Sequence, residues 1–171
     1  VSPTLDLAVA ARAVPLSAAS IVAPGLGLSG AFEAQARLAG TPSAPQGDWR
    51  VSIVGLSAPA TRSNGLPPLK VDASGRLSVG RTSLDAIVAG PGFGPIRASG
   101  SAPLDAAGAL DLKIDGRLDL ALANRQLGAD GRRVAGAAVI DARVTGRANA
   151  PRIEGGARFD GVTFSDAEYG V

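Results

Sequence analysis

Alternation of apolar and charged residues constrains the fold of this chain more than any other feature. The clearest example runs from Leu110 to Leu122, where Leu or Ile occupies nearly every second position and charged residues fill most of the positions between. Successive side chains of a β-strand point to opposite faces, whereas a helix of period 3.6 would spread this pattern around its circumference. The segment therefore predicts a strand with one apolar and one charged face, broken or bulged at Gly116.

The same two-residue period recurs along the rest of the chain. Clusters of Gly and Pro separate the alternating segments, as expected of turns, and no stretch has the pattern of a convincing amphipathic helix. We therefore predict an all-β domain with nine or ten strands. The other alternating segments are residues 5–9, 32–38, 49–53, 69–73, 84–88, 138–144 and 157–159, and the turn clusters are residues 23–25, 65–68, 90–92 and 150–151.

Two segments match one another at a fixed spacing. Residues 30–45 and 136–151 both have Gly ten residues after Gly, Arg seven residues after the first Gly, and Ala-Pro ending five residues beyond the second. Another alternating segment follows each. The pattern indicates a repeated unit of strand, turn and return strand, and such units stack along one axis. We place loose repeats near residues 26–56 and 136–164 of a single domain.

The apolar face of these strands must be covered in some way. A sheet with one apolar face has to pack on another layer or curl on itself. Here that face consists of Ala, Leu, Val and Ile with few large rings. Two curled walls of this kind could close into a dry core, or they could leave a gap suited to an acyl chain. Composition does not choose between these outcomes.

The residue types that are missing exclude several kinds of chemistry. The 171 residues include no Cys, His or Met. A disulfide, a zinc–thiolate site, an iron–sulfur cluster and a Ser-His-Asp triad therefore cannot be built. Only two Lys and one Tyr remain besides the carboxylates as general acids or bases. We expect no enzymatic activity, no cofactor and no metal.

The distribution of charge argues against a nucleic-acid partner. The formal net charge is +2, and the basic residues are scattered, with Arg132 and Arg133 as the only adjacent pair. Binding of nucleic acid requires a clustered basic face, commonly with aromatic residues on which bases stack. One Trp, one Tyr and four Phe provide no such platform. The pattern is typical of a solvated surface.

Three local motifs have ordinary structural interpretations. Residues 25–30 match the G-x-G-x-x-G dinucleotide fingerprint, but the following segment has the pattern of a strand where the fingerprint needs a helix. Residues 90–95 are rich in Gly but lack the Gly-Lys-Ser/Thr ending of a phosphate loop, which favours a hairpin turn. Asp111, Asp115 and Asp119 share one strand face at spacings of about 13 Å, too far apart to converge on a cation.

Two stretches carry a family resemblance. The first runs from Leu28-Ser-Gly30 through Leu-Ala-Gly40-Thr-Pro-Ser-Ala-Pro45 to Trp49-Arg-Val-Ser-Ile-Val-Gly55-Leu. The second is Val144-Thr-Gly-Arg-Ala-Asn-Ala-Pro151-Arg-Ile-Glu-Gly155-Gly-Ala-Arg-Phe-Asp-Gly-Val162-Thr-Phe. They resemble the TamB family, the inner-membrane subunit of the translocation and assembly module of diderm bacteria. That family is grouped with AsmA-like and bridge-like lipid-transfer proteins, and the resemblance is clearest over residues 26–56 and 109–164.

The resemblance implies a fold, a location and partners. The fold is an elongated, curled sheet, called a β-taco, with an open, solenoid-like form and a continuous hydrophobic interior groove. Residues 1–171 would be one fragment of that domain. The full-length protein would be anchored in the inner membrane and cross the periplasm toward an outer-membrane barrel of the TamA type. The implied function is phospholipid transport between the two membranes and support of outer-membrane protein assembly and secretion.

Combining this resemblance with the alternation gives a predicted set of groove residues. Acyl chains would lie along an aliphatic lining while head groups stay at the wet opening, and no residue would be catalytic. The predicted lining is Phe32, Leu38, Val51, Ile53, Leu84, Val88, Leu112, Ile114, Leu118, Leu120, Ile140, Val144 and Phe159.

Two other functions stay open at this point. The chain could be a structural or interaction scaffold with a closed core, which binds a barrel partner by adding strands to its open edges. A secreted β-solenoid of the adhesin kind would need many identical short rungs, whereas the repeats here are loose.

Overall fold

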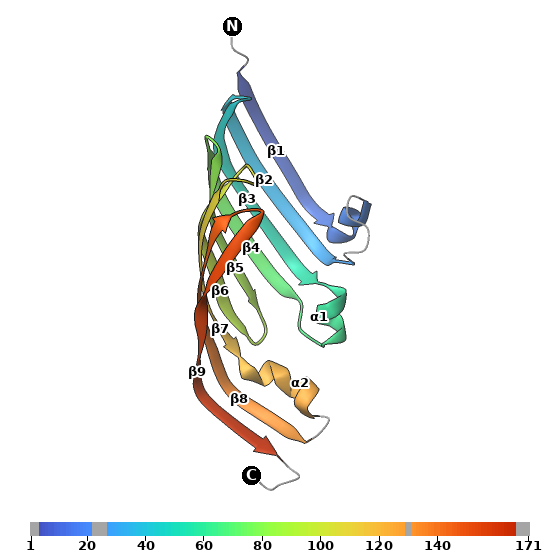
Figure 1. Ribbon diagram of the computed structural model, residues 1–171. Helices are drawn as coiled ribbons and strands as arrows, with labels where there is room; N and C mark the ends of the chain where they lie inside the picture. Colours follow the sequence, from blue (N-terminus) through green and yellow to red (C-terminus); the bar gives the residue numbers. More distant parts are fainter. Residues whose placement is uncertain (1–3, 22–26, 129–130, 167–171) are drawn as a thin grey trace.

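The computed structural model describes residues 4–21, 27–128 and 131–166, and β-strands make up most of them (Figure 1). The strands are β1 (Leu5–Pro15), β2 (Ser29–Thr41), β3 (Ala44–Ser57), β4 (Leu69–Ser78), β5 (Arg81–Gly90), β6 (Phe93–Pro103), β7 (Ala109–Asp119), β8 (Arg132–Arg147) and β9 (Ala150–Asp166).

All nine strands belong to one antiparallel sheet. Each strand pairs with its neighbours in the sequence, so the order in the sheet is β1 to β9 without a crossover. The prediction of an all-β chain is confirmed. The alternation did not indicate strand β6. The predicted turn at residues 90–92 is confirmed, because Gly90 at the end of β5 pairs with Phe93 at the start of β6.

Short helical segments follow the strands at one end of the sheet. They are η1 (Leu16–Ile21) after β1, α1 (Pro59–Ser63) after β3, and η2 (Leu120–Ala123) with α2 (Asn124–Leu127) after β7. At the opposite end, β2–β3, β4–β5 and β8–β9 are joined by tight two-residue turns, at residues 42–43, 79–80 and 148–149, and β6–β7 by the loop 104–108. The helical segments therefore line one rim of the molecule.

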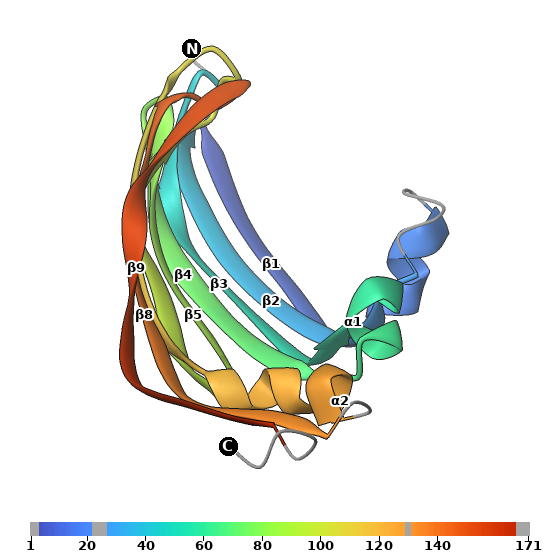
Figure 2. The same ribbon diagram turned by 60° about the horizontal axis from the view of Figure 1, so that its bottom comes forward.

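The sheet is curved along the length of its strands. Figure 2 shows the strands bending into a deep arc, with the helical segments on its concave side. Strands β1 and β9 form the two free edges, at opposite sides of the sheet in Figure 1. The described residues thus form an open, curled sheet and not a closed barrel.

The strand predicted from Leu110 to Leu122 is wrong at its C-terminal end. Strand β7 ends at Asp119, whose side chain accepts a hydrogen bond of 2.8 Å from the backbone N–H of Ala121. This cap begins the 3₁₀ turn η2, and Leu120 and Leu122 belong to it and not to the strand. Capping by an Asp side chain overrides the continued apolar periodicity.

Gly116 does not break or bulge β7 against β8, where it pairs in register with Ile140. The irregularity lies on the other side, in the pairing of β6 with β7 between Phe93 and Arg97. A Cβ at Gly116 would lie 2.8 Å from the side chain of Ile96. The glycine therefore makes room for an apolar side chain from β6.

The two matching segments adopt the same local structure, a hairpin with a glycine irregularity. Gly30 of β2 and Gly136 of β8 have φ of 123° and 116°, and the strand pairing shifts beside each. Opposite them lie Gly55 and Gly161, with φ of 72° and 59°. A Cβ at either first glycine would meet the carbonyl oxygen of its partner at under 3.0 Å.

The predicted turn clusters fall into three cases. Residues 65–68 connect α1 to β4, in agreement with the prediction. Ala150 and Pro151 are already part of β9, so the predicted turn there is displaced: it lies at residues 148–149. The cluster at residues 23–25, like part of the 25–30 motif, lies outside the described residues. The segment after that motif is strand β2 and not a helix.

Very little of the sheet is buried. The accessible surface of the chain is 10819 Å², whereas a compact protein of 16.9 kDa would expose about 7,700 Å². Among the described residues, Ala137 and Ala138 are the only buried hydrophobic ones. The chain is therefore a single layer whose apolar face is not covered by a second one.

Candidate functional site

The candidate site is the apolar face of the sheet. Strand pairing places apolar residues opposite one another, so that they form rows across the strands. One such row, followed from β2 to β9, reads Phe32, Ile53, Val71, Val88, Ile96, Gly116, Ile140 and Ala157. The register therefore keeps the apolar positions of all these strands on a single face.

Twelve of the thirteen predicted lining residues lie in strands on this face. Leu120 is the exception, because it lies in η2. The row through Leu112 continues to Val144 and Ile153, and the row through Leu118 continues to Ala138 and Phe159. The predicted set is thus brought together as one surface, with Leu120 at the helical rim.

The predicted lining omitted several members of this face, among them Val71, Ile153, Ile96 and Trp49. Ile96 was overlooked because its alternating stretch is short and lies between Pro95 and Gly100. Trp49 was included in an alternating segment but not in the lining. It pairs with Ala36 and so belongs to the same face, and a lone aromatic residue in an aliphatic pattern was the available signal.

Trp49 lies across two neighbouring strands. Its Nε1 donates a hydrogen bond of 2.7 Å to the hydroxyl of Thr82 in β5. A Cβ at Gly75, in the intervening strand β4, would lie 2.7 Å from the indole ring. The indole ring can therefore lie over β4 only because residue 75 has no side chain. Among the described residues it is the one aromatic ring near the tight-turn end of this face, and its N–H is hydrogen-bonded.

Several large apolar side chains are open to solvent. In the edge strand β9, Ile153 is 71% exposed and Phe159 is 62% exposed. At the other edge, Leu7 and Val9 of β1 are also exposed. Large exposed apolar side chains can belong to interaction surfaces, which makes this face the candidate site.

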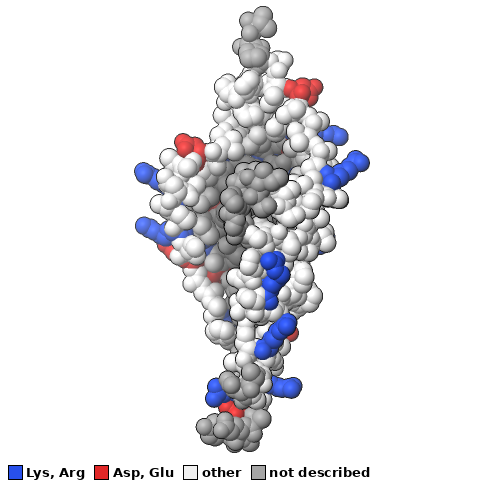
Figure 3. All heavy atoms as spheres, turned by 90° about the vertical axis from the view of Figure 1, so that its right-hand side faces the viewer, with Lys and Arg blue, Asp and Glu red and all other residues white. Residues whose placement is uncertain are grey.

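The apolar face is the concave one. Figure 3 looks toward the side that carries the helical segments and shows a hollowed surface made mostly of uncharged residues. Its Lys, Arg, Asp and Glu side chains lie chiefly toward the outline and the lower part. This curved surface with few charged side chains is therefore the candidate site.

The opposite face carries the charged residues in cross-strand pairs. Asp111 of β7 accepts hydrogen bonds of 2.9 and 3.0 Å from Arg143 of β8, and Asp48 of β3 lies 3.0 Å from Arg76 of β4. Among the described residues, no group of three or more carboxylates could hold a metal ion. Asp111 is paired with Arg143 and Asp119 caps η2, so neither is positioned as a cation ligand.

Asp72 is a carboxyl group whose pKa is lowered by its neighbours. Lys70 lies 2.8 Å away, and the hydroxyl of Ser52 donates a hydrogen bond of 2.7 Å. These two interactions lower the pKa of Asp72 below its ordinary value, with Lys70 as the larger cause. Because the Asp72 side chain is half exposed, we attribute its lowered pKa to ion pairing on the solvated face and not to a catalytic role.

Arginines hold the helical rim together. Arg62 of α1 donates hydrogen bonds to the carbonyl oxygens of Gly27 and Ser57 at 3.0 and 3.3 Å. From α2, Arg125 donates to the carbonyl oxygen of Gly65 at 3.2 Å. The bonds to Gly27 and Gly65 join segments that are far apart in the sequence: they tie α1 to the segment before β2 and α2 to the connection after α1.

Comparison with family models, curated proteins and solved structures finds no match to this chain. Within the described part of the chain, no helix has the length and hydropathy needed to cross a bilayer.

Proposed function

We propose that this chain is a segment of a lipid-transfer protein that shields acyl chains in a hydrophobic β-groove formed by the concave face. The observation that carries the proposal is the alignment of apolar residues across all nine strands, on a face that no second layer covers. Such a surface is unfavourable in water without an occupant.

The chemistry of the lining suits sliding better than tight capture. Its members are mainly Ala, Val, Leu and Ile, and the indole N–H of Trp49 is already bonded to Thr82. Each methylene taken from water into such a surface gains about 0.8 kcal/mol. An acyl chain would thus be held only by the burial of its apolar surface, while the polar head group of the lipid stays at the open side.

The biological setting follows from the resemblance to the TamB family alone. On that basis, the full-length protein would be anchored in the inner membrane, lie in the periplasm and engage an outer-membrane barrel of the TamA type. It would carry phospholipid between the membranes and support outer-membrane protein assembly. We propose no enzymatic step, cofactor or metal.

Site-specific photo-crosslinking in cells tests the proposal. A photo-reactive amino acid is placed at Leu112, on the apolar face, and separately at the adjacent Asp111, on the charged face, in the full-length protein. Mass spectrometry then identifies the adducts. The proposal predicts phospholipid adducts at Leu112 and none at Asp111, because the two side chains point to opposite faces of β7.

A different result would favour the scaffold function. Protein crosslinks at Leu112, with lipid at neither position, would mean that another protein layer closes the face. The free edges favour this second candidate, because β9 is 17 residues long and presents one unpaired backbone side. Strand addition at β9 would then be the main mode of binding to a barrel partner.

A further inference from the structure

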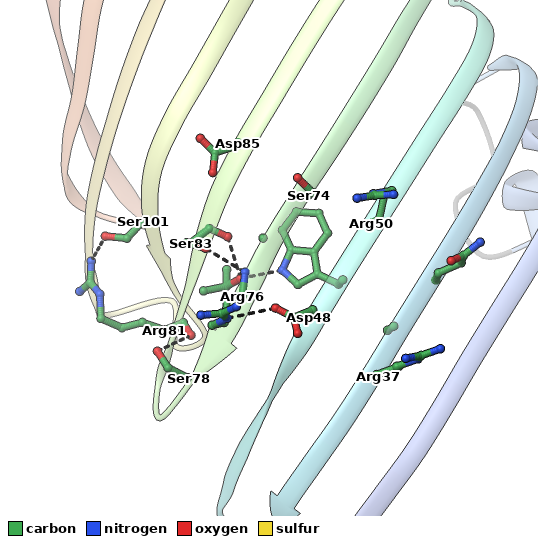
Figure 4. Close-up of a pocket in the computed structure, with 15 residues that line it drawn as sticks. Arg37, Asp48, Arg50, Ser74, Arg76, Ser78, Arg81, Ser83, Asp85 and Ser101 are labelled. Atoms are coloured by element: carbon green, nitrogen blue, oxygen red, sulfur yellow. Dashed lines mark hydrogen bonds and ion pairs between the residues drawn. The ribbon is translucent and has the colours of Figure 1, made fainter.

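A depression in the charged face collects arginine side chains. It has a volume of about 770 Å³ and lies over β2 to β6 toward their tight-turn ends (Figure 4). Most of its lining side chains belong to the charged face by strand register. The charged members are Arg37, Asp48, Arg50, Arg76, Arg81 and Asp85, and hydroxyl groups of Ser74, Ser83 and Ser101 lie among them.

Of five depressions compared among the described residues, this one carries the largest positive excess. Four arginines face two aspartates, which gives an excess of two positive charges. In the other four of these five the opposite charges balance to within one. The excess is therefore local and is not a general property of a chain with net charge +2.

Many hydrogen-bond donors in the depression are still available. Among the described residues, the side chains of Arg37 and Arg50 make no hydrogen bond or ion pair. Arg76 binds Asp48 through Nε, and Arg81 binds Ser101 through Nη2, so each guanidinium keeps further N–H groups. The hydroxyl of Ser83 accepts a bond from the backbone N–H of Arg76 and can still donate its proton.

We propose that this depression binds a phosphate group. Guanidinium groups present N–H pairs that match phosphate oxygens bidentately, and serine hydroxyls add neutral donors. A phosphate monoester dianion would also neutralise the excess of two charges, and the phosphodiester of a head group would neutralise one of them. The group could belong to a phospholipid head group or to a soluble phosphate ester. Eleven of its fifteen lining residues lie on the face opposite the acyl surface, the others being Ala36, Trp49, Gly75 and Thr82, and binding of phosphate there does not require the proposed function.

Binding is measured with two probes on the whole 171-residue chain at low ionic strength. Glycerol 3-phosphate represents the soluble ester, and its binding is followed by NMR of the arginine Nε–H signals. Vesicles of phosphatidylglycerol, with phosphatidylcholine vesicles for comparison, represent the head group. The test variant is Arg37→Gln with Arg50→Gln, chosen because neither side chain has a partner whose loss would disturb the sheet. The matched control is Arg152→Gln in β9, on the same face but outside the depression.

The double variant is expected to lose at least about tenfold in affinity, while Arg152→Gln stays within about twofold. Binding of glycerol 3-phosphate identifies a soluble ester as the ligand class. Binding of phosphatidylglycerol vesicles alone, with the same dependence on Arg37 and Arg50, identifies a lipid head group. Absence of binding to both probes overturns the proposal. An equal loss in the test and control variants also overturns it, because binding would then reflect only diffuse surface charge.

Discussion

At the scale of single residues, one carboxyl group of the charged face has a pKa that its neighbours lower. Lys70 and Ser52 hold the pKa of Asp72 below its ordinary value of about 3.9. The ionised carboxylate therefore stabilises the fold above that value, and the contribution is lost as the pH falls through the lowered pKa. Because the pair is exposed to solvent, the contribution is small.

Asp72→Asn is expected to lower the free energy of unfolding by less than about 1 kcal/mol at neutral pH. The difference from the parent chain should disappear when the pH falls below the lowered pKa. Urea unfolding at a series of pH values measures this. Asp6→Asn, at an exposed position in β1, is the control and should change little. A difference that persists unchanged in acid would contradict the assigned role of Asp72.

Glycine conformation is the second constraint at this scale. At Gly136, φ is 116° and a Cβ would meet backbone oxygens of Gly161 and Asp160 at 2.8 and 2.9 Å. Gly136→Ala should therefore lower the free energy of unfolding by about 1–3 kcal/mol. Gly156→Ala is the matched control, because a Cβ at Gly156 in β9 meets nothing within 4 Å. Equal effects of the two substitutions in urea unfolding would contradict the account.

At the scale of elements, alternation predicted most strands because one face of each is apolar and the other charged. It failed where local chemistry competes. Asp119 caps a 3₁₀ turn, so Leu120 leaves the strand although its apolar period continues. In β6, Ile96 alternates between Pro95 and Gly100, and such residues are the usual signals of turns. Glycine occurs both at turns and at irregularities within strands, so the sequence alone does not distinguish these two positions.

The helical rim is held by bonds that no sequence pattern indicated. Arg62→Ala removes its hydrogen bonds to the carbonyl oxygens of Gly27 and Ser57. The backbone amides of residues 62, 64 and 66, which bond within α1 and its exit, should exchange with solvent at least about fivefold faster, which corresponds to roughly 1 kcal/mol. Arg147→Ala, at the opposite end of the sheet, serves as the control. Unchanged exchange in Arg62→Ala would mean that the rim does not depend on this arginine.

At the scale of the whole molecule, a single curved layer explains both the large accessible surface and the scarcity of buried residues. The sequence predicted the apolar face because alternation is local to each strand. The curled form was expected only from the family resemblance, because the alternation alone could not predict the curvature or the pairing of β1 through β9, which depend on register across the sheet. Trp49 joined the candidate site through such pairing, with Ala36 and across Gly75. The arginine depression likewise assembles residues from five strands.

Trp49 also provides the most direct test of the claim that this face holds acyl chains. It is the only Trp in the chain, so its fluorescence reports on one position of the face. The purified chain is mixed with phospholipid whose acyl chains carry bromine, which quenches indole fluorescence on contact, and with the same lipid without bromine. The control combines Trp49→Phe with Ser99→Trp, which moves the reporter to the charged face.

The account predicts strong quenching of Trp49 by the brominated acyl chains, none by the unbrominated lipid, and none of the Trp at position 99. Equal emission from Trp49 with both lipids, at concentrations where the chain is in excess lipid, would mean that acyl chains do not reach the concave face. That result would contradict the account.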